Sequence, residues 1–395
     1  MSLDVPIITT TLGASPELAT RIAKGFKDGV LRREGGVIRN IDNGQFVGFL
    51  RDVPGTQSTA NSLSPLLQLN AAASALNLSI TAVGFVVLMK RLDAIEQKLV
   101  AVSQVLQGLN RKLDLSFLAN FRAALELARS AFAMAEEANR RASAYQAINR
   151  FLEAEHHYLG LLDMELADGG WAVSPYFNTL MLAYVSSARC YLELGETETA
   201  QRHLVDGENA LAPRLNRYYQ IVVGVNPAIY LHPGLSDQIT LERLTRLKRH
   251  HQPRITGVEC FEELRQQIWD TAVQDPDSWI MKLPTALWNH AVDGEKKIGP
   301  MRRRISSNEM VKKLLSRLPE AFDQVEQAHE SLDSVRGFEA ELGYVLENKI
   351  RYTDWSRLEM PPAGASDSIV LLLPEKSELL SSLNSKQVSM SVISE

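Results

Sequence analysis

The chain has 395 residues, enough for two or three domains or for one elongated helical body. Hydrophobic residues make up 45% and aromatic residues only 7%, which favours packing between helices over a β-sandwich. A net charge of -5 excludes a global field that draws the chain to nucleic acid, and two cysteines exclude a disulfide framework. We expect Cys190 and Cys260 to be free thiols buried in helices.

The first 11 residues lack a basic stretch followed by an apolar one, so no secretory signal is predicted. A cytoplasmic chain is therefore expected, with membrane association left open. Ser15, Pro16 and Glu17 indicate the start of a helix, because serine accepts hydrogen bonds from free backbone N–H groups and proline is tolerated in the first turn.

A β-hairpin is predicted next. The apolar stretches Val37–Ile41 and Gln45–Leu50 flank Asp42, Asn43 and Gly44, and asparagine and glycine tolerate the positive φ angles of hairpin turns. Because an isolated hairpin is only marginally stable, it is expected to pack on helices or to pair with another strand.

Residues 53–89 contain no aspartate, glutamate, lysine or arginine, a run of 37 residues in a chain that is 23% charged. After Pro65 the apolar residues recur at helical spacing, with small polar residues on another face. Three interpretations stay open: a central buried helix, a helix that enters a membrane after a conformational change, and a constitutive membrane span. The residues of this candidate membrane segment are Leu66, Leu69, Ala73, Leu76, Asn77, Ile80, Val83, Phe85 and Val87.

Charge returns at Lys90, and a heptad pattern begins there. Apolar residues spaced alternately by four and three positions predict a coiled-coil contact, within the chain or with another copy. This seam consists of Leu88, Leu92, Ile95, Leu99, Val102, Leu106, Leu109 and Leu113. A second helix is expected after Ser116, because Phe121, Leu125 and Ala128 continue the helical spacing.

Residues 180–213 resemble one tetratricopeptide repeat, in which small residues let two helices approach closely and a glycine closes the first helix. The residues that carry the resemblance are Tyr184, Ala188, Tyr191, Gly195, Ala200 and Leu204. No second copy is found, and stacked repeats need neighbours, so a simple helical hairpin is the alternative.

Residues 213–236 are rich in proline, asparagine and glycine and are interpreted as a loop with a short strand at Tyr219–Val223. Helices are expected near Leu241–Lys248 and Cys260–Val273, and a long one from Ser307 to about Ile350. Pro319 lies inside this long pattern and is expected to kink or divide the helix. The tail from Pro361 is rich in serine, although Ile369–Leu373 is able to add one strand to the hairpin.

No phosphate-binding loop, nucleophile elbow or dinucleotide-binding motif is present, so neither an enzyme nor a cofactor is predicted. Two Glu-x-x-His pairs, Glu153 with His156 and Glu326 with His329, have the spacing of di-iron ligands. They lie far apart in the chain, and solvated helix faces are the preferred interpretation. The two basic clusters are interpreted as solvated surface, with lipid headgroups or an acidic partner as the alternative; they cover residues 243–254 and 296–304.

The combined prediction is a mainly α fold, an elongated helical bundle with long coiled-coil-like helices and a small N-terminal β-hairpin. The expected parts are 1–56, the helix and hairpin; 57–170, the apolar segment and coiled coil; 171–215, the repeat-like hairpin; 216–360, a helical region; and 361–395, the tail. The arrangement loosely resembles α-helical pore-forming toxins and related bacterial effectors. This resemblance implies a membrane-acting protein that binds lipid and self-associates, and the alternative is a helical scaffold that binds a partner protein. Nucleic acid is not an expected partner.

Overall fold

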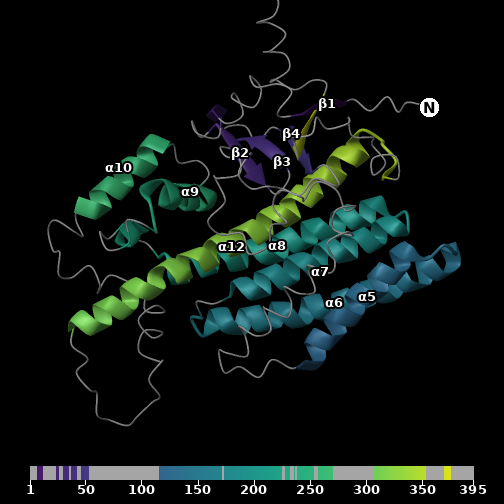
Figure 1. Cartoon of the computed structure of the whole chain (residues 1–395), viewed down its shortest axis with the longest axis horizontal. Helices are drawn as coiled ribbons and strands as arrows, with labels where there is room; N and C mark the ends of the chain where they lie inside the picture. The colour runs from purple at the N-terminus through teal and green to yellow at the C-terminus, as the bar shows by residue number, and fades with distance from the viewer. Residues whose placement is uncertain are drawn as a thin grey trace, which may run out of the picture. The chain divides into compact units, whose positions relative to one another are not determined.

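A computed structural model of the chain describes residues 7–11, 24–25, 30–34, 37–41, 46–52, 115–170, 173–224, 227–231, 235, 238–252, 257–269, 307–352 and 369–374. This part of the chain holds seven α-helices, one 3-10 helix and five strands (Figure 1). The mainly α fold is therefore confirmed. Two compact units are present: unit 1 comprises Met1–His157, Thr179–Asn209 and Glu330–Glu395, and unit 2 comprises Tyr158–Asn178 and Ala210–His329.

The strands of unit 1 form one antiparallel sheet in the order β1-β5-β4-β3-β2. The bounds are β1 Ile7–Thr11, β2 Leu31–Glu34, β3 Val37–Asn40, β4 Phe46–Asp52 and β5 Ile369–Pro374. The predicted hairpin is β3 with β4, in which Val37 faces Phe49 and Ile38 faces Gly48. The strand predicted near the C-terminus is also confirmed: β5 pairs with β4 on one side and β1 on the other, which gives the hairpin the partners that it needs.

Unit 1 contains α5 (Leu115–Ala133) and the first part of α6 (Glu137–Ala167), which lie side by side (Figure 1). Their contact is apolar, with the rings of Phe121 and Phe151 5.7 Å apart in an edge-to-face arrangement. The helix predicted from the spacing of Phe121, Leu125 and Ala128 is confirmed, and all three side chains are buried.

Helix α7 (Ser174–Glu193) is buried along most of its length. Gly195 (φ 82°) ends it with the backbone pattern of a left-handed cap, because Glu196 N–H donates to the carbonyl of Tyr191 and Gly195 N–H to that of Leu192. Helix α8 (Thr197–Val222) then begins. Gly207 faces the ring of Tyr184 so closely that an added Cβ atom would lie 2.8 Å from it. The two helices therefore approach as a tight hairpin.

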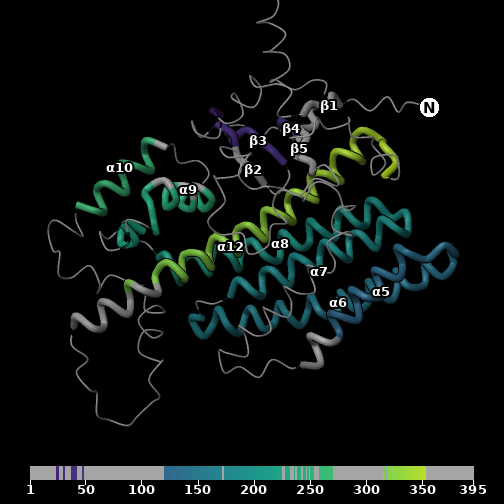
Figure 2. The backbone as a smooth tube through the Cα atoms, in the orientation of Figure 1, coloured from purple at the N-terminus to yellow at the C-terminus, as the bar shows by residue number. Residues whose placement is uncertain are grey.

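Unit 2 contains the second half of α8, the 3-10 helix η2 (Pro227–Leu231), α9 (Leu241–His251), α10 (Gly257–Ile268) and the first half of α12 (Ser307–Glu347). Figure 2 shows α9 beside α10. The core of this unit is aromatic: Tyr230 packs on Phe322 and Phe177 stacks on Tyr218. Thr240 caps α9 by accepting a hydrogen bond from the N–H of Arg243 at 3.2 Å.

Two sequence predictions in this region were wrong. The first part of the predicted loop 213–236 and all but the last residue of the predicted strand Tyr219–Val223 lie in α8, which passes through Pro213 and ends only at Val222. The physical reason is the apolar spacing, which continues past the proline and buries one side of the helix. That side consists of Leu204, Leu211, Leu215, Tyr218 and Val222.

Helix α12 also differs in part from its prediction. It begins at Ser307 as expected, but Pro319 does not divide it, since one helix of 41 residues continues to Glu347. Phe322, Val325, Leu332 and Val335 are buried as their spacing predicts. Burial of this face offsets the backbone hydrogen bond that proline cannot make.

The candidate membrane segment Leu66–Val87 and the coiled-coil seam Leu88–Leu113 lie outside the described residues. Most of the helix expected from Ser15 and all of the basic cluster 296–304 do as well; of that helix only residues 24–25 are described, and they are helical. Within the described ranges, none of the helices combines the length and the hydropathy that crossing a bilayer requires.

Candidate functional site

The most polar contacts of unit 2 lie along α9, which packs its charged and imidazole side chains against neighbouring helices. We call this set the α9 seam. It comprises Arg243, Lys248 and His251 of α9 and their partners Asn216, Tyr219, Glu263, Asp323, Glu326 and His329.

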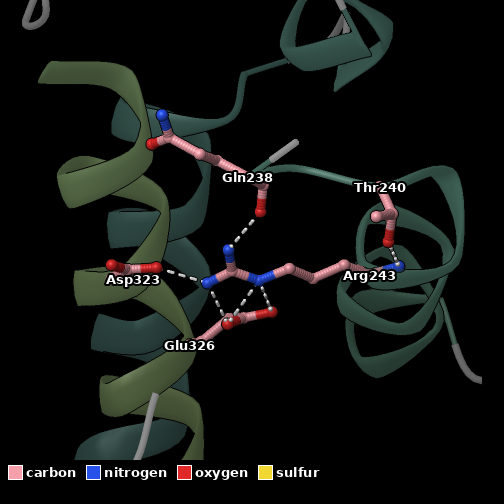
Figure 3. A network of polar contacts seen from close by, with 5 residues as sticks. All are labelled: Gln238, Thr240, Arg243, Asp323 and Glu326. Carbon is pink, nitrogen blue, oxygen red and sulfur yellow. Dashed lines mark hydrogen bonds and ion pairs between the residues drawn. The ribbon is translucent and has the colours of Figure 1, made fainter. Parts of the chain in front are cut away.

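Arg243 is the centre of the largest network in the seam (Figure 3). Its guanidinium donates to both carboxylate oxygens of Glu326, to Asp323, and through Nη1 to the carbonyl of Gln238 at 2.8 Å. It also lies over the ring of Phe322, 5.0 Å from the centroid. The side chains of Arg243 and Glu326 are each only 11% exposed. A planar fork of donors matches two carboxylates, so this network holds α9 on α12 in one orientation.

Lys248 makes the second ionic contact of the seam. Its side chain is buried, and its ammonium group pairs with the half-exposed carboxylate of Glu263 on α10. A buried ammonium without a carboxylate is strongly unfavourable, so this pair links α9 to α10.

His251 makes the third contact, between two imidazole rings. Its Nε2 lies 2.6 Å from Nε2 of His329, and its Nδ1 lies 3.0 Å from Oδ1 of Asn216. The ring stacks on Tyr219 with centroids 3.6 Å apart. Only one proton fits between the two Nε2 atoms, so the contact requires one ring to donate and the other to accept. Protonation of both rings places two N–H groups against each other.

Acid is expected to weaken this contact. Burial, and then the neighbouring His250, lowers the pKa of His251 to about 3. The unfolded chain takes up this proton near pH 6.5 and the folded chain only far lower, so the unfolded state binds more protons in between. The free energy of unfolding should therefore fall by about 1–2 kcal/mol between pH 7 and pH 5. Urea denaturation at the two pH values, followed by helical circular dichroism, measures it.

The comparison variant is His251→Gln, which should lose most of that pH dependence. His156→Gln, on an exposed face of α6, should keep it. Equal pH dependence in the wild-type chain and in His251→Gln would show that another group is responsible.

Unit 1 holds a second buried polar cluster. Oε1 of Glu155 on α6 lies 3.0 Å from Nε2 of His203 on α8, and the imidazole ring lies between Tyr184 and Tyr191. Burial raises the pKa of Glu155, while the hydrogen bond and charge of His203 oppose the rise. No local sequence pattern indicates this pair, because its residues are 48 positions apart. They meet only because α6 packs against α8.

Two interpretations of the sequence change here. Solvated helix faces are found for Glu153 and His156, but the interpretation was wrong for Glu326 and His329, which belong to the seam. The basic cluster 243–254 is likewise not all solvated surface, because Arg243 and Lys248 pair inside unit 2. The physical reason is pairing between helices: Arg243 and His251 of α9 meet Glu326 and His329 of α12, and Lys248 meets Glu263 of α10.

The repeat-like residues lie on the α7–α8 hairpin. Ala188, Ala200 and Leu204 are fully buried between packed helices, and Gly195 makes the turn. The helical hairpin is thus present, and its assignment as a tetratricopeptide-like repeat stays a prediction. Cys190 and Cys260 are buried thiols outside any disulfide, as predicted, and burial raises the pKa of the Cys190 thiol to about 12.

The polar contacts in these clusters hold helices together. No group of three potential metal-binding side chains occurs among the described residues. The seam instead joins α9 to three other helices through contacts whose strength depends on charge. Comparison of the chain with protein-family models, with curated proteins and with solved structures gives no match, so its function has to be argued from these contacts and from the sequence.

Proposed function

We propose that this chain is a non-enzymatic α-helical protein of the pore-forming or effector type, made in the cytoplasm, that acts on membranes through segment 66–89. One observation carries the proposal: residues 53–89 lack any charged side chain, whereas the chain as a whole is 23% charged. A run of this length covers the roughly 20 residues that a helix needs to cross a bilayer. Its apolar side chains gain about 25 cal/mol per Å² whether they are buried in protein or in lipid.

Because burial is worth similar amounts in both places, a small change in the stability of the helical body is enough to shift the segment from one to the other. The α9 seam supplies such a change. His251 stays neutral while it contacts His329 and joins α9 to α12, whereas an opened state that exposes His251 to water takes up a proton near pH 6.5. Acid is therefore the trigger that we propose.

Dye release from anionic liposomes tests the proposal. The wild-type chain should release dye at pH 5 and not at pH 7. Ile80→Asp should reduce release at least tenfold, because a carboxylate in the bilayer centre costs about 2.5–3.5 kcal/mol. The matched variant Asn77→Leu, one turn away in the same segment, should keep release intact.

Both variants must show wild-type circular dichroism at pH 7, so that a loss of release is not a loss of folding. A wild-type chain that releases no dye and never floats with lipid, in acid or after protease treatment, would refute membrane action.

A second function is favoured by the α7–α8 hairpin. In this role the chain is a soluble helical scaffold, and the hairpin together with the coiled-coil seam Leu88–Leu113 binds a partner protein. Close approach of Gly207 to Tyr184 supports it, since tight helical hairpins are the building blocks of protein-binding repeats. The liposome assay separates the two functions, because a scaffold releases no dye under any of these conditions.

A further inference from the structure

Helix α10 exposes a stripe of large apolar side chains. Val258 is 74% exposed, Phe261 45%, and Trp269, which directly follows the helix, 55%. At 100° per residue these positions lie within about 80° of one another. Cys260 and Leu264, on the opposite face, are fully buried against the unit. The inner face of α10 is thus occupied, and its outer face carries apolar side chains of the kind found in the centre of protein interfaces.

The same stripe carries one opposite pair of charges. Glu262 and Arg265 form an ion pair at 2.8 Å within the helix, and both side chains are more than half exposed. An exposed pair of this kind contributes little to the stability of the helix, so its members are available for another arrangement.

The stripe is self-complementary when two copies run antiparallel. Residues 258 and 269 are equally far from the midpoint between residues 263 and 264, and so are residues 262 and 265. A two-fold axis at that midpoint places Val258 opposite Trp269 of the second copy. It also places Glu262 opposite Arg265 in both directions, so that two ion pairs form across the contact.

We propose that the outer face of α10 is a self-association surface, whose occupant is the α10 of a second copy of this chain in antiparallel orientation. Charge complementarity selects that occupant. The two-fold arrangement pairs Glu262 with Arg265 in both directions and Val258 with Trp269, while Phe261 lies opposite Gln266. This inference does not rest on membrane action, because the contact needs no lipid.

The contact is small, since the stripe extends over roughly 16 Å of helix. Interfaces of this size lie at the low end for specific association. We therefore expect a reversible dimer whose population rises with protein concentration.

Sedimentation equilibrium at pH 7 without lipid tests the surface by charge reversal. Glu262→Arg places two arginines opposite each other on both sides of the two-fold axis, and Arg265→Glu places two glutamates there. Each variant alone should associate at least tenfold more weakly than the wild-type chain. An equimolar mixture of the two should recover association, because every opposed pair is then again of opposite charge.

Arg150→Glu is the control, since Arg150 forms a comparably exposed ion pair with Glu153 on α6. It should leave association unchanged. The proposal is overturned if the wild-type chain stays monomeric at all concentrations. It is equally overturned if either reversal on α10 leaves association intact, or if the mixture associates no better than its components.

Discussion

Replacement of Arg243 by methionine is expected to lower the free energy of unfolding by about 3–5 kcal/mol. The substitution keeps most of the aliphatic volume but leaves the buried carboxylate of Glu326 without its guanidinium partner. Removal of one member of a buried ion pair costs far more than the pair itself contributes, because the remaining charge stays desolvated. Urea denaturation at pH 7 measures the change.

Two companion variants make this result specific. Arg150→Met removes an exposed ion pair and should change stability by less than about 1 kcal/mol. Arg243→Met combined with Glu326→Met should be more stable than Arg243→Met alone, since no desolvated charge is then left at position 326. If Glu326→Met lowers the free energy of unfolding as much in the Arg243→Met chain as it does in the wild-type chain, this account is contradicted.

Replacement of Gly207 by leucine is expected to lower the free energy of unfolding by about 3 kcal/mol. Even a Cβ atom at this position would lie 2.8 Å from the ring of Tyr184, so a longer side chain forces α7 and α8 apart. The midpoint of urea denaturation should shift to lower concentration.

The matched control is Gly160→Leu, the same substitution in the exposed part of α6. An added Cβ atom meets nothing within 4 Å there. Leucine should raise stability by about 0.5–1 kcal/mol, because glycine is a poor helix former. If both substitutions stabilise the chain, the approach of α7 and α8 at Gly207 is not as tight as the structure has it.

Sequence reasoning recovered the elements whose signals are local. The turn residues Asp42–Gly44 predict the β3–β4 hairpin, and the spacing of Phe121, Leu125 and Ala128 predicts α5. These signals are strong because a strand or a helix buries one face at a fixed period. The helix was predicted to end at Pro213, because proline usually breaks a helix. The apolar face of α8, which continues past this residue, was the weaker signal.

The sequence by itself determined the helical class of this protein, the hairpin, the buried thiols and the charge-free run that motivates membrane action. The tertiary structure alone decided which charges are internal: Arg243 with Glu326, Lys248 with Glu263, His251 with His329, and Glu155 with His203. A charged side chain is exposed or paired according to which helix packs against it. That choice depends on contacts between residues as many as 83 positions apart, and no local periodicity records them.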